Sequence, residues 1–197
     1  MAKGNISRKM KKINGGSLSG DGNILLEKGW RKIGEYELTA EDEKAMLVFS
    51  PTVGTNANTA YVETPAFRCE KLRIYIESPM QSELSGSTYT AYVEAASDAE
   101  GKVFDLSPGA KRFFGWTILS KTYDVYSAID IVTSPYMPTH AEGFNNGKLG
   151  ASDVSTTQIS WSGEKQQLSQ VTGVRLSFGT TLNFYAGMKF VLLGVDK

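Results

Sequence analysis

The stretch that decides the fold is Val171-Thr172-Gly173-Val174-Arg175-Leu176-Ser177-Phe178, followed after a short break by Gly187-Met188-Lys189-Phe190-Val191-Leu192-Leu193-Gly194. In the first run, apolar residues alternate with Arg175 and Ser177, which is the period of a strand with one buried face. Glycine and small polar residues separate the two runs, and too few residues intervene for a helical crossover. The pattern therefore predicts that the two runs pair as an antiparallel hairpin.

The second run has an apolar residue at nearly every position. Its period-2 spacing predicts that Phe190 faces the core and that Lys189 faces the opposite side. Val191 and Leu193 make that opposite side apolar as well. Either a second layer, the arm or a neighbouring subunit, covers this side, or it is left as an exposed patch, and we expect cover by a neighbouring subunit.

A resemblance to a known family rests on the two ends of one region. It begins with Gly29-Trp30-Arg31-Lys32-Ile33-Gly34-Glu35-Tyr36, and it ends with the strand at 171–178 and Asn183-Phe184-Tyr185-Ala186-Gly187-Met188-Lys189-Phe190-Val191-Leu192-Leu193-Gly194-Val195. These stretches resemble the first strand and the C-terminal hairpin of small β-sandwich modules in tailed-bacteriophage virion proteins. The resemblance implies a tail-fibre, baseplate or capsid-decoration component. It implies other virion proteins as partners, and a location in the virion after synthesis in the bacterial host cytoplasm.

Composition limits the class of protein. A chain of 197 residues is long enough for one well-buried core, which predicts a single folded domain. Its 20 glycines against 6 prolines suit many strands joined by tight turns. No apolar run is long enough to span a bilayer, so the sequence predicts no membrane helix. The first residues lack the apolar core of a signal peptide.

The N-terminal region is basic and rich in glycine. Five of the first twelve residues are basic, and no acid occurs before Asp21. The basic residues are Lys3, Arg8, Lys9, Lys11 and Lys12. We interpret residues 1–28 as an extended arm, either a solvated tail or an anchor on an acidic neighbouring subunit, and residues 29–197 as the folded domain. No aromatic residue lies among the basic ones, so nucleic-acid binding is not expected.

Short alternating runs recur along the domain. The strand candidates are residues 33–39, 45–50, 66–77, 89–95, 103–106, 111–120, 123–132 and 158–161, in addition to the two C-terminal runs. The one helical signal is a capped turn that begins at Thr39, with Asp42 three residues later. Short strands at regular spacing predict an all-β fold, a two-sheet antiparallel β-sandwich of jelly-roll type.

The longest stretch without a strand period covers residues 133–156. It contains two prolines and the turn-like Asn145-Asn146-Gly147, which predicts a long loop, and long loops are often functional. Aromatic faces can stack on sugar rings, so the sequence predicts a glycan-binding cluster in or beside this loop. Its members are Tyr136, His140, Phe144 and Trp161. The alternative is that these aromatic residues belong to the core.

Residues for catalysis or metal binding are sparse. His140 is the sole histidine, which excludes multi-histidine zinc sites, and no serine lies in a nucleophile-elbow motif. Asp124 and Asp130 could act as an acid–base pair on a glycan, but strand-edge acids exposed to solvent are the simpler interpretation. The sequence therefore predicts no catalytic residues, no metal and no cofactor.

Two further carboxylates and one thiol are candidates for metal binding or reactivity. Glu142 and Asp153 could contribute to a calcium site, but the region lacks the spacing of an EF-hand. Cys69 is the only cysteine, so it forms no internal disulfide, and we expect it to be a small buried core residue.

Two classes of function remain at the level of the sequence. The first is a non-enzymatic virion structural protein that forms a homo-oligomer, with a trimer favoured because fibres are often trimeric. In this class the domain is displayed, and one option within it is display toward a glycan of the host surface. The second class is a free carbohydrate-binding module or a glycan-active enzyme, for which a basic arm has no evident use.

Overall fold

The computed structural model describes residues 12–13, 16–17, 29–85, 88–97, 114–121, 124–133, 139–149, 152–160, 168–178 and 182–197. These residues form strands and a single 3-10 turn. The elements are β1 (Lys12–Ile13), β2 (Gly16–Ser17), β3 (Trp30–Glu37), η1 (Ala40–Asp42), β4 (Met46–Ser50), β5 (Thr59–Glu63), β6 (Cys69–Ser78), β7 (Thr88–Ala96), β8 (Phe114–Ser120), β9 (Val125–Val132), β10 (His140–Leu149), β11 (Ser152–Ser160), β12 (Gly173–Phe178) and β13 (Lys189–Asp196).

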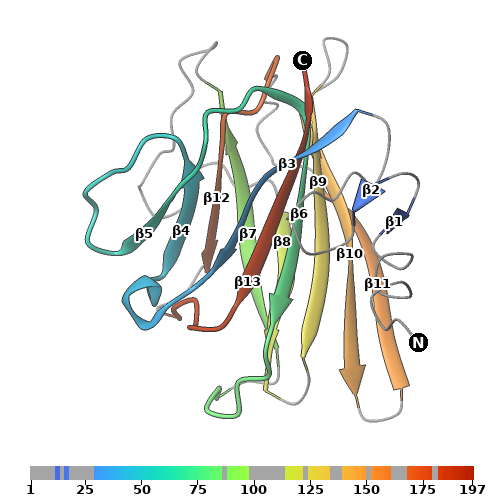
Figure 1. Ribbon diagram of the computed structural model, residues 1–197. Helices are drawn as coiled ribbons and strands as arrows, with labels where there is room; N and C mark the ends of the chain where they lie inside the picture. Colours follow the sequence, from blue (N-terminus) through green and yellow to red (C-terminus); the bar gives the residue numbers. More distant parts are fainter. Residues whose placement is uncertain are drawn as a thin grey trace, which may run out of the picture.

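Six strands form one antiparallel sheet in the order β11-β10-β9-β6-β13-β3 (Figure 1). Its centre is β6, where Leu72, Ile74 and Ile76 are buried and the residues between them face the other side. This strand alternates as the sequence predicted. The first strand of the sandwich, β3, pairs with the last, β13, through a register shift between Leu192 and Leu193.

Five strands form the second sheet in the order β5-β4-β12-β7-β8. Four of them pair antiparallel, but β5 runs parallel to β4, with Leu47 opposite Ala60. The sheet is therefore mixed rather than wholly antiparallel as predicted. Strand β5 is not among the predicted strands, because small polar residues precede it.

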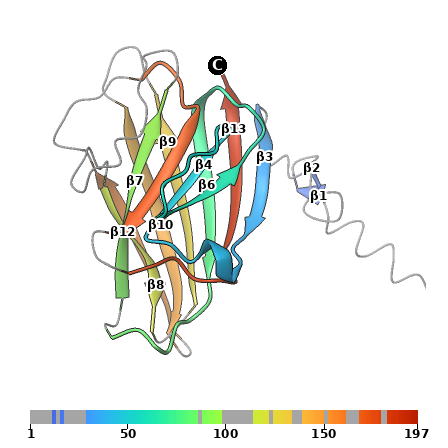
Figure 2. The ribbon, with the colours of Figure 1, turned by 90° about the vertical axis from the view of Figure 1, so that its left-hand side faces the viewer.

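The two sheets stack face to face and enclose the core (Figure 2). Phe49 of the five-stranded sheet meets Phe190 of the six-stranded sheet, with ring centroids 5.2 Å apart. Tyr36, the cross-strand neighbour of Phe190 on β3, also packs against Phe49, with ring centroids 5.4 Å apart. The described residues thus form an all-β sandwich, which confirms the predicted fold class. In the N-terminal region, β1 and β2 pair with each other.

The predicted C-terminal hairpin is wrong in its pairing. The strand β12 pairs with β4 and β7, whereas β13 pairs with β3 and β6 in the opposite sheet. The connection between β12 and β13 crosses from one sheet to the other and carries Phe184 into the core, where its ring lies 4.6 Å from that of Phe178. Period-2 alternation identifies a strand but not its partner, which explains the error.

The predicted loop at 133–156 is also wrong. Residues 140–149 form β10, which pairs with β9 on one side and with β11 on the other, and residues 152–156 belong to β11. Asn145-Asn146-Gly147 lies within β10 and makes no turn. A side chain at Gly143 would overlap the backbone carbonyl oxygen of Ala128 on β9. The glycine therefore allows close approach of the two strands rather than breaking one.

Both faces of β12 are buried, although one exposed face was expected. On the side away from the core, Arg175 is 3% exposed and lies directly opposite Glu94 of β7, which is 6% exposed. The two side chains form an ion pair, with Arg175 Nε donating to Glu94 Oε2. A buried charge needs such a partner, because desolvation of a single ion is costly.

The predicted capped turn at Thr39 is confirmed as η1. The backbone amide and hydroxyl of Thr39 both donate to Asp42 Oδ2, at 2.9 and 2.8 Å. Both bonds run from Thr39 to the Asp42 carboxylate, and they hold the turn that follows β3.

Candidate functional site

The outward face of the six-stranded sheet carries the polar side chains of its strands in cross-strand rows. In one row Arg73 of β6 lies between Asp130 of β9 and Leu193 of β13. In the next row Tyr75 lies between Ala128 and Val191. In a third row Glu77 lies between Tyr126 and Lys189. The register thus places residues from distant parts of the chain side by side.

In the Arg73 row the two charged side chains are paired with each other. Arg73 Nε and Nη2 donate to the two carboxylate oxygens of Asp130, both at 2.6 Å. These hydrogen bonds raise the pKa of Arg73 above its ordinary value. The guanidinium also lies 4.9 Å from the centre of the Trp30 ring, in a cation–π contact. Leu193 in the same row is only 1% exposed in this chain alone, so it needs no neighbouring subunit to cover it.

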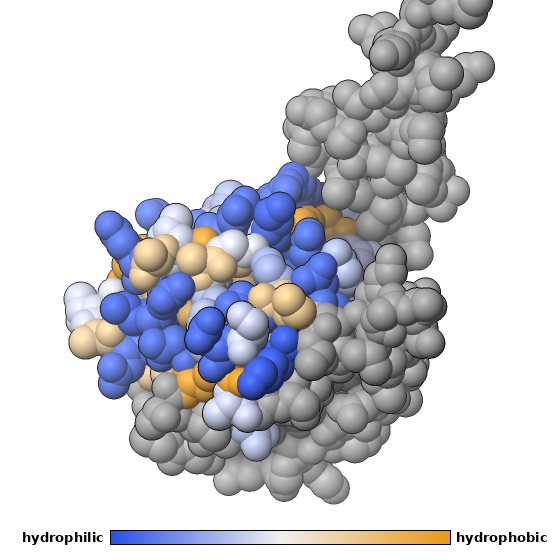
Figure 3. Space-filling view, turned by 90° about the horizontal axis from the view of Figure 1, so that it is seen from below, coloured by the Kyte–Doolittle hydropathy of each residue, from blue (hydrophilic) through white to orange (hydrophobic). Residues whose placement is uncertain are grey.

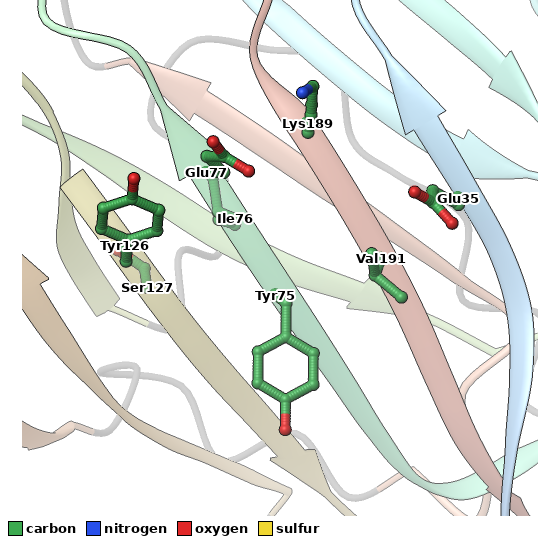
Figure 4. Close-up of a pocket in the computed structure, with 8 residues that line it drawn as sticks. All are labelled: Glu35, Tyr75, Ile76, Glu77, Tyr126, Ser127, Lys189 and Val191. Atoms are coloured by element: carbon green, nitrogen blue, oxygen red, sulfur yellow. The ribbon is translucent and has the colours of Figure 1, made fainter. Parts of the chain in front are cut away.

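The Tyr75 and Glu77 rows form a groove instead. The groove has a volume of about 240 Å³. The residues that line it are Glu35, Tyr75, Ile76, Glu77, Tyr126, Ser127, Lys189 and Val191. In Figure 4 the side chains of Tyr75, Tyr126 and Val191 lie in front of the ribbon, and both tyrosine rings are seen broadside. The groove is therefore an open platform with aromatic faces rather than a closed cavity.

Several polar groups of the groove have no intramolecular partner in the described part of the chain. Neither Glu77, Tyr126 nor Lys189 makes a side-chain hydrogen bond or ion pair with another described residue. Tyr126 is 45% exposed, which is high for a tyrosine within a sheet. Glu35, by contrast, accepts a hydrogen bond from Lys32 Nζ at 2.6 Å. The middle of the groove thus offers a hydroxyl, a carboxylate and an ammonium group to a ligand.

One aromatic residue of the groove is held in place by the neighbouring row. Arg73 Nη1 donates to the hydroxyl of Tyr75 at 3.4 Å, and the guanidinium lies 5.9 Å from the centre of the same ring. Because Asp130 fixes Arg73, these contacts also restrict the Tyr75 ring. A platform that is ordered before binding loses less entropy when a ligand docks.

The aromatic cluster predicted from the sequence is only partly described. His140 begins β10 opposite Val132, and Phe144 lies farther along β10 opposite Ala128. Tyr136 and Trp161 lie outside the described residues. Whether the four residues form one cluster therefore stays a prediction.

The carboxylates that were considered for catalysis are engaged elsewhere. Asp124 accepts a hydrogen bond from the backbone amide of Met80 at 2.8 Å, whereas Asp130 is bound to Arg73. They do not form an acid–base pair with each other. In the regions that the structure describes, no group of three or more His, Cys, Asp or Glu residues is arranged to hold a metal ion. Glu142 of β10 therefore belongs to no such group.

Cys69 is a free, buried cysteine, as expected from the sequence. Burial raises the pKa of its thiol to about 11, which keeps the thiol protonated near neutral pH. A side chain at Gly194 of β13 would overlap its sulfur atom, so Cys69 fills the space beside a glycine. Its environment is that of a packing residue rather than a nucleophile.

The predicted anchoring residues lie at the edge of what the structure describes. Lys3, Arg8, Lys9 and Lys11 are outside the described residues, and Lys12 belongs to β1. The anchoring role of the arm stays a prediction.

The coloured residues at the lower end of the sandwich form no large apolar patch. Among the residues coloured by hydropathy in Figure 3, hydrophilic ones predominate, and apolar ones form small separate areas. Such scattered apolar residues are ordinary for a protein surface.

Comparison of the chain with protein-family models and with curated protein sequences finds no match. Within its described residues, the chain has no helix of the length and hydrophobicity needed to cross a membrane.

The residues of the groove are not among the site residues predicted from the sequence. Tyr75 and Glu77 are the outward positions of the clearest alternating strand, so their exposure was predictable. Their neighbours Tyr126 and Lys189 come from β9 and β13, and only the strand order brings them together.

Proposed function

We propose that the protein is a non-enzymatic structural component of a bacteriophage virion. The proposal places the β-sandwich on display as part of a tail fibre, a baseplate or a capsid decoration, and it assigns the basic N-terminal arm to anchoring. The resemblance of residues 29–36 and 171–195 to virion modules is the starting point of this proposal.

The order of the strands is the observation that carries the proposal. In a jelly roll, the first strand pairs with the last in one sheet, and the second pairs with the second-last in the other. Here β3 pairs with β13, and β4 pairs with β12. The sheets continue with β6 and β9 beside β13, and with β7 and β8 beside β12. This order supports a jelly-roll assignment, an architecture found in viral capsid proteins and in lectins.

The remaining strands are additions to that scheme. The strand β5 extends the edge beside β4, and the hairpin of β10 and β11 extends the edge beside β9. Both additions leave the eight-strand order intact. We infer that they adapt a general scaffold to its particular partners, which would be other virion proteins and further copies of this chain, with a trimer favoured.

Analysis of purified particles tests the proposal. Particles released from the bacterial host are purified, and their proteins are identified by mass spectrometry and located by antibody labelling in negative-stain images. The protein should be present in the particles at a symmetric location on the tail or the capsid. Its absence from particles, together with its abundance in the soluble lysate, would contradict the virion role.

The groove favours a second candidate, a carbohydrate-binding module. Two tyrosine faces beside a free carboxylate are a common basis for sugar recognition, and lectins also use the jelly roll. A free module would bind glycans without being part of a particle, so the same purification separates the two candidates.

A further inference from the structure

We propose that the groove on the outward face of the six-stranded sheet is a binding site for a neutral saccharide. The site consists of Tyr75, Tyr126, Glu77, Lys189, Glu35 and Val191. The inference goes beyond the virion role and rests on the groove alone, so it can hold or fail independently of that role.

The shape of the groove suits a flat ligand of modest size. At about 240 Å³ it lies somewhat below the roughly 300 Å³ at which pockets for drug-sized ligands begin. Its floor includes Val191, and Tyr75 and Tyr126 present their ring faces in Figure 4. A sugar ring has one face of C–H groups that packs on such a surface, and its hydroxyl groups project sideways.

The polar groups of the groove match those hydroxyl groups. A saccharide hydroxyl both donates and accepts hydrogen bonds, so it can bind a carboxylate and an ammonium group together. Glu77 and Lys189 are direct cross-strand neighbours, and neither has a side-chain partner among the described residues. Tyr126 lies on the other side of Glu77, in the same row. Acceptor and donor thus lie next to one another within the groove.

The charge of the groove argues against ionic ligands. Lys32 neutralises Glu35, and Glu77 and Lys189 carry opposite charges, so the groove has no net charge to attract phosphate, sulfate or acidic sugars. An organic cation could pack on the tyrosine faces, but it would meet the ammonium group of Lys189. A neutral ligand with many hydroxyl groups satisfies both constraints.

The neighbouring Arg73 row supports this assignment by contrast. It lies on the same face of the same strands, yet Arg73 and Asp130 neutralise each other through two short hydrogen bonds. The outward charges of the Arg73 row are thus neutralised within the sheet. In the Glu77 row, by contrast, Glu77 and Lys189 form no ion pair with each other.

Binding is tested on the whole protein with three kinds of probe. An array of immobilised neutral oligosaccharides is screened first, and a binding sugar is then titrated while backbone amide signals are followed by NMR. Choline chloride and inorganic phosphate serve as the cationic and anionic probes. We expect shifts confined to β3, β6, β9 and β13 around the groove with a neutral sugar, and no saturable shifts with the other two.

Matched variants link binding to the named side chains. Tyr126→Ala should weaken saccharide binding about tenfold or more, whereas Tyr126→Phe should keep most of it because the ring face is retained. Glu77→Gln and Lys189→Ala should each weaken binding several-fold. Glu70→Gln, an exposed carboxylate of the same strand that lies outside the groove, should leave binding unchanged. Thermal unfolding of each variant confirms that it is folded.

Three outcomes would overturn the proposal. The first is that no neutral sugar on the array binds, or that binding is unaffected by Tyr126→Ala. The second is that choline or phosphate binds with the same dependence on these residues, which would make the groove an ion site. The third is that the groove signals shift with protein concentration alone, which would make it an interface between copies of the chain.

Discussion

Phe49 and Phe190 come from opposite sheets, and their rings meet in the core with centroids 5.2 Å apart. Phe190→Ala should therefore reduce the free energy of unfolding by about 3 to 5 kcal/mol, the usual cost of removing a buried phenylalanine. Lys189→Ala, which changes the adjacent exposed residue, should alter it by less than about 0.5 kcal/mol. Chemical denaturation measures both. Equal losses would contradict the inward position of Phe190 and the outward position of Lys189.

The buried ion pair of Arg175 and Glu94 should be sensitive to the loss of one partner. Glu94→Ala leaves a buried guanidinium without its carboxylate and should cost about 3 to 5 kcal/mol. The double variant Arg175→Met with Glu94→Leu removes both charges and keeps the volume. It should be less destabilised than the single variant in the same denaturation experiment. A double variant that is destabilised as much as Glu94→Ala, or more, would show that charge pairing is not what stabilises this site.

The thiol of Cys69 should make stability depend on pH in the alkaline range. In the folded protein burial raises its pKa to about 11, whereas in the unfolded chain the pKa is near the ordinary 9.0. Between these values the unfolded state has lost the proton and the folded state retains it, so the free energy of unfolding falls as pH rises. Below pH 9 the thiol contributes no pH dependence.

A cysteine-free control isolates this effect. Stability curves of the parent protein and of Cys69→Ala, measured from pH 7 to pH 11, should run parallel up to about pH 9 and then converge. The slope of the convergence should approach about 1.4 kcal/mol per pH unit. A constant difference over the whole range would contradict the raised pKa.

Removal of the arm should separate folding from assembly. Deletion of residues 1–22 should leave the thermal unfolding of the sandwich unchanged, because this segment offers little apolar surface to the core. Incorporation into virus particles, measured by quantitative immunoblotting, should fall sharply. A second variant with Lys3, Arg8, Lys9, Lys11 and Lys12 replaced by serine tests whether charge is responsible. Normal incorporation of the deletion variant would refute anchoring by the arm.

The oligomeric state of the pure protein gives an independent test of the structural role. Appendages of virions follow closed symmetry, so light scattering should give the mass of an oligomer, with a trimer favoured. A monomer that assembles only on its partner in the particle is also consistent with the role. A stable monomer that binds no particle component would count against it.

The sequence predicts the inward and outward residues of single strands well. The alternation of Leu72, Ile74 and Ile76 and the inward position of Phe190 follow from the two-residue period alone, and both are confirmed. The partners of each strand do not follow from that period. The strands of the two C-terminal runs, β12 and β13, follow one another in the chain but lie in opposite sheets. The connection between them has its own buried residue, Phe184, which packs in the core.

The remaining errors have a related cause. Gly143 and Asn145-Asn146-Gly147 suggest a loop by their local preferences, yet pairing with β9 and β11 draws them into a strand. Tertiary pairing overrides weak local propensity, most easily for strands. The groove escaped notice for the same reason, since Tyr126 and Glu77 become neighbours only through the pairing of β6 with β9.

The pairing of β3 with β13 has a consequence for synthesis. Among the described strands, β13 is the sole neighbour of β3, and it lies at the other end of the sandwich in sequence. While the ribosome is still translating the residues before β13, β3 has an unpaired edge and Arg31 has no Asp196 to bind. The nascent six-stranded sheet can close only after Asp196 has left the exit tunnel. Until then the growing chain exposes strand edges that invite pairing with other chains, so chaperones that cover such edges should favour its folding.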